Sequence, residues 1–257
     1  MFDKELLNIL EESSSKGEST TIFHVFSGTK EIGGLILSGQ SIVQVGDLSP
    51  IIYGKVRDHL VKADNNMLYS RVSQFLLEEQ DQVYKVVVET LDPPPSLYVF
   101  GAGHVGQAVA LIGALLGYRV VVIDDRKEFL TIERFPNPNI ELWEENYDRI
   151  SNNLKLPANS AVVIVTRGHQ YDETCLKQII NFNIRYIGMI GSRRRVVTIF
   201  QRLVKEGIDE ELLKKVHAPI GLKIDAISPQ EIAVAIMAEI IDVMNGLRLY
   251  QDRERRQ

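Results

Sequence analysis

One stretch, LYVFGAGHVGQAVALIGALLGYRVVVIDDR at 97–126, constrains the fold of this chain more than any other. The apolar run at 97–100 predicts a buried strand, and the segment after Gly106 carries apolar residues at helical spacing. A second apolar run at 119–123 predicts another strand, which ends in two aspartates. Strand, glycine turn, helix and strand in this order indicate a βαβ unit of a parallel sheet.

The turn between the first strand and the helix has the spacing GxGxxG. Gly101 permits the tight turn, Gly103 lets a pyrophosphate approach the backbone, and Gly106 lets the helix pack closely on the strand. The start of the helix offers unpaired N–H groups and a positive dipole end to a phosphate. Asp124, about 20 residues further on, is expected to accept hydrogen bonds from a ribose diol. This context favours a dinucleotide site over a turn that only closes the sheet.

The residue after the two aspartates bears on which dinucleotide is bound. Arg126 can meet a 2′-phosphate, whereas Asp124 repels one. NAD-like ligands are therefore expected over NADP-like ones.

Three consecutive prolines, Pro93-Pro94-Pro95, predict a stiff boundary between two domains, because proline lacks an N–H donor and stays extended. Before them, strand-like runs at 20–26, 32–37, 41–45 and 83–91 alternate with helical segments. We therefore predict a smaller α+β domain at 1–92. A Rossmann-like domain with a doubly wound parallel sheet is predicted at 93–257, and the fold class is α/β.

The α/β alternation continues after the glycine turn. Apolar runs at 161–165 and 186–190 predict two more buried strands. Between Arg126 and the first of these runs no strand is predicted, and residues 147–154 are assigned to a short helix. Asp172 is expected to cap the helix that follows it. The last helix is predicted to begin at the capping box Ser228–Glu231 and to end at Gly246.

Ligands of open parallel sheets sit outside the carboxyl ends of the strands. Polar, glycine-containing turns follow three of the predicted strands here, and two aspartates follow the fourth. The residues expected to bind the cofactor are Gly101, Gly103, His104, Val105, Gly106, Asp124, Asp125, Arg126, Thr166, Arg167, Gly168, His169, Gly191, Ser192, Arg193 and Arg194.

The chemistry of these residues leaves several alternatives open. The cluster Arg193–Arg195 suits a phosphate, or is a solvated first helical turn. His104 and His169 could transfer protons, or only form local hydrogen bonds. Cys175 is expected to be a small core residue. Catalytic residues stay unassigned and no metal site is predicted, because no nucleophile–base pair and no cluster with metal-ligand spacing is apparent.

Composition excludes several classes of protein. A net charge of −5 argues against a general nucleic-acid-binding surface. A single cysteine excludes an intramolecular disulfide framework and a cysteine-based zinc site. The acidic N-terminus does not resemble a signal peptide, and no apolar run reaches the length of a membrane span. A cytoplasmic protein is expected.

A set of motifs resembles the XdhC/CoxI family, the accessory proteins of xanthine dehydrogenase and related molybdenum hydroxylases. The motifs occur in family order over about residues 93–246. They are Pro93-Pro94-Pro95, GAGHVG at 101–106, IDDR at 123–126, ERFP at 133–136, TRGHQYD at 166–172, YIGMIGSRRR at 186–195, HAPIGL at 217–222 and SPQEIA at 228–233.

The resemblance implies a C-terminal Rossmann-like domain and a role in binding the molybdenum cofactor (molybdopterin) and delivering it, in sulfurated form, to a hydroxylase. It also implies a homodimer that contacts the hydroxylase client and a cysteine desulfurase. The first domain departs from the family pattern. Its nearest glycine-containing stretches are Ile32–Leu35 and Gln44–Ser49, no cysteine precedes Cys175, and the first domain of this chain is therefore divergent.

Three functions compete on these grounds. The first is an accessory factor in maturation of a molybdenum hydroxylase, with no turnover of its own. The second is an NAD(P)-dependent oxidoreductase that uses the same crevice. The third is a nucleotide-sensing regulatory module. The lack of an apparent catalytic dyad counts against the second, and whether the chain is an enzyme stays open.

Overall fold

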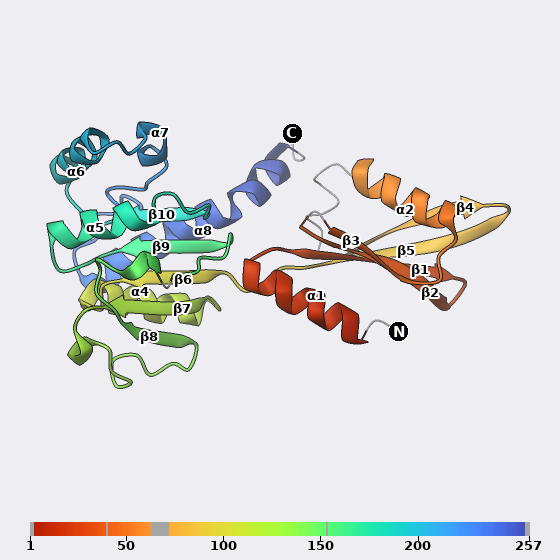
Figure 1. Ribbon diagram of the computed structural model, residues 1–257, viewed down its shortest axis with the longest axis horizontal. Helices are drawn as coiled ribbons and strands as arrows, with labels where there is room; N and C mark the ends of the chain where they lie inside the picture. The colour runs from red at the N-terminus through yellow and green to blue at the C-terminus, as the bar shows by residue number, and fades with distance from the viewer. Residues whose placement is uncertain (1–2, 40, 63–71, 153, 255–257) are drawn as a thin grey trace. The chain divides into compact units, whose positions relative to one another are not determined.

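The computed structural model describes residues 3–39, 41–62, 72–152 and 154–254. The chain forms two compact units, Met1–Pro93 with Gln251–Gln257, and Pro94–Tyr250. Each unit has its own sheet and its own hydrophobic core (Figure 1).

The first unit is α+β, with a five-stranded antiparallel sheet in the order β3-β2-β1-β5-β4. Along β1, Ile22 belongs to one core and Phe23 to the other, as the alternation of side chains in a strand requires. Helix α2 packs on the Phe23 face and helix α1 on the Ile22 face. The elements are α1 (Asp3–Lys16), β1 (Thr20–Ser27), β2 (Lys30–Ser38), β3 (Ser41–Gly46), α2 (Pro50–Lys62), β4 (Val72–Glu79) and β5 (Gln82–Leu91).

The second unit contains a five-stranded parallel sheet in the order β10-β9-β6-β7-β8. If β6 to β10 are numbered 1 to 5 in chain order, the sheet read from β8 has the order 3-2-1-4-5. This is the order of the doubly wound Rossmann sheet. The predicted fold class is therefore confirmed. The strands are β6 (Ser96–Phe100), β7 (Arg119–Asp124), β8 (Ile140–Glu144), β9 (Ser160–Ile164) and β10 (Tyr186–Met189).

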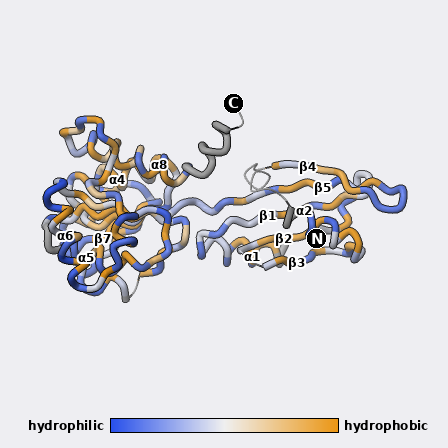
Figure 2. The backbone as a smooth tube through the Cα atoms, turned by 90° about the horizontal axis from the view of Figure 1, so that it is seen from above, coloured by the Kyte–Doolittle hydropathy of each residue, from blue (hydrophilic) through white to orange (hydrophobic). Residues whose placement is uncertain are grey.

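Helices cover both faces of this parallel sheet. Helices α4 and α8 pack on the face of Leu97 and Val99, whereas α5 and α6 pack on the face of Tyr98 and Phe100. The central strands are buried on both sides, and Figure 2 shows a hydrophobic centre ringed by hydrophilic loops. The helices are α4 (His104–Leu115), α5 (His169–Ile179), α6 (Arg193–Lys205), α7 (Glu210–Leu213) and α8 (Pro229–Glu254).

The structure corrects three sequence-based assignments. The sequence does not predict strand β8, because glutamates interrupt its short apolar run and it is a half-buried edge strand. Helix α8 does not end at Gly246 but continues to Glu254. A single interior glycine costs a helix only about 1 kcal/mol, which its neighbours can outweigh.

The third correction concerns residues 147–154, which contain a 3-10 turn at Ile150–Asn152 instead of the predicted helix. The side chain of Gln178 explains the difference. Its amide donates to the carbonyl oxygen of Tyr147, and its Oε1 accepts from the N–H of Ser151 at 2.8 Å. These are the two backbone groups that an α-helix would join to each other.

Candidate functional site

The parallel sheet brings the carboxyl ends of β6, β7, β9 and β10 to one edge, as the sequence predicts. The strand order reverses between β6 and β9, which is where open parallel sheets bind their ligands. Here the two loops begin side by side, because the N–H of Val165 donates to the carbonyl oxygen of Phe100 at 2.9 Å. The glycine turn and the segment Thr166–Gly168 therefore start side by side at this edge of the sheet.

Two of the three glycines in the turn are required by the fold itself. Gly101 has a φ of +113°, and a Cβ there would lie 2.5 Å from the carbonyl oxygen of Val165. A Cβ at Gly106 would lie 1.8 Å from the carbonyl oxygen of Gly101. A side chain at either position would force the turn apart.

Gly103 differs from the other two glycines, because a Cβ there would meet nothing within 4 Å. It is the N-cap of α4, makes no side-chain cap, and precedes a first turn without acidic residues. His104 is exposed at the start of the helix, and Val105 packs against the core. The start of α4, beside this free space at Gly103, is where a phosphate is expected to bind.

Asp124 is fully buried, and its carboxylate is saturated by neighbours in the same unit. Oδ2 accepts from the N–H of Ala102 at 2.7 Å and from Nη2 of Arg126 at 2.9 Å. Oδ1 accepts from Nε of Arg126 at 2.8 Å and from its backbone N–H at 3.0 Å. Burial would raise the pKa of Asp124, but the hydrogen bonds from Arg126 and Ala102 outweigh it and hold that pKa below its ordinary value.

These four bonds fill the acceptor positions of the Asp124 carboxylate. A ribose diol would have to displace Arg126 in order to bind Asp124. The paired charge also removes the repulsion on which the preference for NAD-like over NADP-like ligands depended. The sequence could not indicate this bidentate ion pair, because the pair depends on the orientation of the Arg126 side chain.

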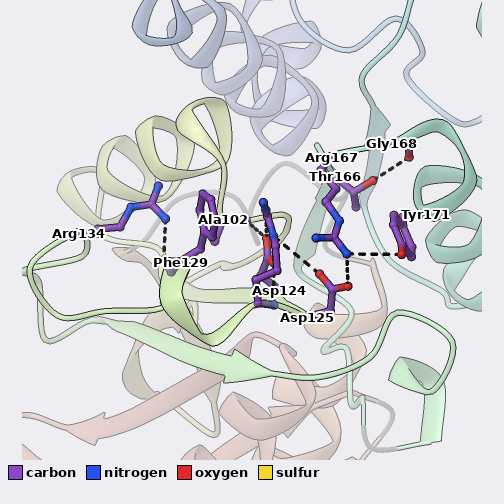
Figure 3. Close-up of polar contacts among 10 residues, drawn as sticks. Ala102, Asp124, Asp125, Phe129, Arg134, Thr166, Arg167, Gly168 and Tyr171 are labelled. Atoms are coloured by element: carbon purple, nitrogen blue, oxygen red, sulfur yellow. Dashed lines mark hydrogen bonds and ion pairs between the residues drawn. The ribbon is translucent and has the colours of Figure 1, made fainter.

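Arg126 is held on a second side by an aromatic ring. Its guanidinium lies 3.8 Å from the centroid of Phe129, in cation–π contact. The guanidinium of Arg134 lies 4.8 Å from the same centroid and donates to the carbonyl oxygen of Phe129 at 2.8 Å. Figure 3 shows Arg134 beside Phe129. The segment after β7 is thus fixed by two arginines.

Asp125 and Arg167 form an ion pair between the loops that follow β7 and β9 (Figure 3). Nη2 of Arg167 donates to Oδ2 of Asp125 at 2.8 Å and to the hydroxyl of Tyr171 at 3.4 Å. The guanidinium also lies 5.2 Å from the ring centroid of Tyr171. The hydrogen bond to Tyr171 and the charge of Asp125 raise the pKa of Arg167.

Asp172 is not the N-cap that the sequence predicts. Helix α5 begins at His169 with Gly168 as its N-cap, so Asp172 lies within the first turn. Its buried carboxylate accepts from the N–H and hydroxyl of Thr166 and from Nη2 of Arg195. A partner on α6 thus decides the role of Asp172, and the local sequence carries no sign of it.

The loop after β10 places Gly191 and Ser192 at the start of α6. Ser192 is the N-cap and accepts from the N–H of Arg195 at 3.3 Å. Arg193 and Arg194 are exposed, whereas Arg195 turns toward Asp172. Of the predicted histidines, the side chain of His169 lies outside the described residues.

A polar cluster that the sequence did not assign lies between β10 and α8. Nδ1 of His217 lies 2.9 Å from Oε1 of Glu239, and the hydroxyl of Tyr186 donates to the same oxygen at 2.7 Å. Burial would raise the pKa of Glu239, but the hydrogen bonds from His217 and Tyr186 outweigh it and lower this pKa. The motif HAPIGL pointed to His217, but nothing in the sequence pointed to Glu239, which lies mid-helix.

Two kinds of feature are absent from the described ranges of the chain. No group of three or more histidine, cysteine, aspartate or glutamate residues there is arranged to hold a metal ion. Nor is any helix in those ranges both long enough and apolar enough to cross a bilayer.

The protein is similar to several known proteins. Residues 97–240 match the XdhC Rossmann domain family. Uncharacterized protein YqeB of Escherichia coli (strain K12) is 36% identical over 152 residues, which is 59% of this chain and 28% of that protein. A probable xanthine dehydrogenase subunit of Bacillus subtilis (strain 168) is 31% identical over 170 residues, 66% of this chain and 49% of that protein. The matched region thus spans less than half the length of each relative.

A solved structure supports the same fold. The crystal structure of a xanthine dehydrogenase from Bacillus halodurans superposes with a TM-score of 0.71 at 20% identity. The match covers 96% of this chain and 68% of that one. The match to the Rossmann domain family covers more than half of the sequence. The chain belongs to the XdhC family.

Proposed function

We propose that this protein supports maturation of a molybdenum hydroxylase of the xanthine dehydrogenase type. In this proposal it holds the molybdenum cofactor in the crevice between β6 and β9 and delivers it to the hydroxylase. The cofactor is cargo, and the protein needs no turnover chemistry of its own. Family membership and the relative from Bacillus subtilis support this assignment.

The observation that carries the proposal is the free space beside Gly103 at the start of α4. The pterin cofactor carries a phosphate, often as part of a nucleotide pyrophosphate. Such an anion suits the unpaired N–H groups of α4, where no side chain lies within 4 Å of a Cβ at Gly103. The exposed Arg193 and Arg194 add positive charge along the same edge of the sheet.

The proposal includes partners. A hydroxylase client must receive the cargo, and a cysteine desulfurase would supply the terminal sulfur. We also propose that the protein acts as a homodimer in the cytoplasm. The buried thiol of Cys175 is a poor sulfur carrier, because burial raises its pKa well above the ordinary value.

Mass spectrometry of the retained ligand tests the proposal. Wild-type protein purified from cells that make the cofactor is expected to carry a pterin phosphate. Gly103→Val places a branched side chain in the phosphate position and should lose the ligand. Gly54→Val in α2 is the matched control, because a Cβ there also meets nothing within 4 Å. Recovery of NAD or NADP instead of a pterin would favour the oxidoreductase alternative.

A further inference from the structure

The ion pair between Asp125 and Arg167 joins the loops that follow the two neighbours of β6 in the sheet. Asp125 follows β7 and Arg167 follows β9, and β6 lies between these two strands in the sheet. A contact between their loops must therefore pass over the carboxyl end of β6, where the glycine turn begins. Figure 3 shows the two side chains directed toward each other.

This pair differs from the two arginine–aspartate pairs at the same edge in which the aspartate is fully buried. The side chains of Asp124 and Asp172 are fully buried, and their arginine partners are 18% and 20% exposed. In the crossing pair, Asp125 is 19% exposed and Arg167 is 41% exposed. Ion pairs that reach solvent contribute little to stability and break easily. The crossing pair is therefore the one that can open without disturbing the core.

Both partners have other contacts that would remain after opening. Oδ1 of Asp125 lies 3.8 Å from Nε of Arg126, so its charge keeps a neighbour of opposite sign. Tyr171 holds the Arg167 guanidinium through its hydroxyl and its ring. Arg167 would thus stay beside the carboxyl end of β6 with its N–H donors available. A guanidinium binds a phosphate in the same bidentate geometry as a carboxylate.

We propose that Asp125 is an internal competitor that occupies Arg167 when no ligand is bound. A phosphate-bearing ligand on the glycine turn would replace the Asp125 carboxylate as the partner of Arg167. Asp125 would then restrain ligand affinity, and Arg167 would contribute to it. This inference rests on the proposed ligand site between β6 and β9, but not on the identity of the cargo or the client.

Titration calorimetry with inorganic pyrophosphate at low salt tests the exchange. Asp125→Asn is expected to raise the affinity about two- to fivefold, the equivalent of one exposed ion pair. Arg167→Ala should lower it about tenfold, as expected for one charge-assisted hydrogen bond. In the double variant the gain from Asp125→Asn should shrink, because the share that comes from releasing Arg167 is lost and only the reduced repulsion between residue 125 and the anion remains. Glu211→Gln, which breaks an exposed ion pair on α7, should leave the affinity unchanged.

Several results would overturn the inference. Unchanged or weaker binding by Asp125→Asn would mean that Asp125 does not compete with the ligand. Wild-type affinity in Arg167→Ala, or a gain of the same size in the double variant as in Asp125→Asn, would remove Arg167 from the site. Failure of both wild type and Asp125→Asn to bind pyrophosphate would also reject it. The titration needs no client, so loss of the proposed maturation role would leave these results standing.

Discussion

Replacing Gly106 by alanine is expected to destabilise the second unit through one contact. The new Cβ would lie 1.8 Å from the carbonyl oxygen of Gly101. That residue cannot retreat easily, because its N–H donates to the carbonyl oxygen of Ile123 at 2.8 Å and its φ is +113°. Overpacking usually costs about 1–3 kcal/mol, and a clash with backbone belongs at the top of this range. We expect a loss of about 3 kcal/mol, or roughly 6–12 °C in Tm for a unit of this size.

The single tryptophan makes the assay specific. Trp143 lies in β8, so its fluorescence during urea unfolding reports the second unit alone. Gly103→Ala is the matched control, because its Cβ meets nothing within 4 Å and alanine for glycine at an N-cap costs no more than about 1 kcal/mol. If Gly106→Ala unfolded at the wild-type urea concentration, or if the control lost as much stability, the steric argument would be refuted.

Three further predictions concern buried polar groups. Because the fold lowers the pKa of Asp124, the ionised carboxylate stabilises the protein fully above the ordinary pKa of 3.8, and this stabilisation is lost as the pH falls below that value. The urea midpoint measured by Trp143 fluorescence should therefore fall in acid. An equally steep fall of the midpoint with pH in Asp124→Asn would contradict this. The buried Cys175 thiol, whose raised pKa comes from burial, should not react with a thiol dye until the protein unfolds, and fast labelling of native protein would disprove it. Glu239→Ala leaves the Tyr186 hydroxyl without its acceptor and should cost about 2–3 kcal/mol in the same urea assay, whereas Glu239→Gln should cost less; equal losses would show that the hydrogen bond is unimportant.

The glycine turn and the central strands could be predicted from sequence because their signals are local. A continuous apolar run followed by GxGxxG indicates a buried parallel strand and a close helix. The capping box is equally local, and the structure places Oε2 of Glu231 2.8 Å from the N–H of Ser228. Strand β8 has no such signal, because an edge strand needs only one buried face.

The charge pairs of the site could not be predicted in the same way. Asp124 and Arg126 are two residues apart, yet the ion pair between them occupies the carboxylate that the sequence pattern assigns to a ribose. Asp172 meets Arg195 across 23 positions, and Asp125 meets Arg167 across 42. The two distant pairs depend on segments that only the assembled sheet brings together, and the near pair depends on the orientation of the Arg126 side chain. Residue type and spacing therefore identify the edge but not its contacts.

The proposed role is tested most directly by the state of the client enzyme in cells that lack this protein. The molybdenum hydroxylase would be purified from a deletion strain and from strains complemented with wild type or Gly103→Val, and its molybdenum and terminal sulfur would be measured. We predict that client protein accumulates without its full cofactor in the deletion strain and with Gly103→Val, and that wild type restores it. A client with full cofactor occupancy and normal activity in the deletion strain, with any neighbouring paralogue also removed, would contradict the proposal.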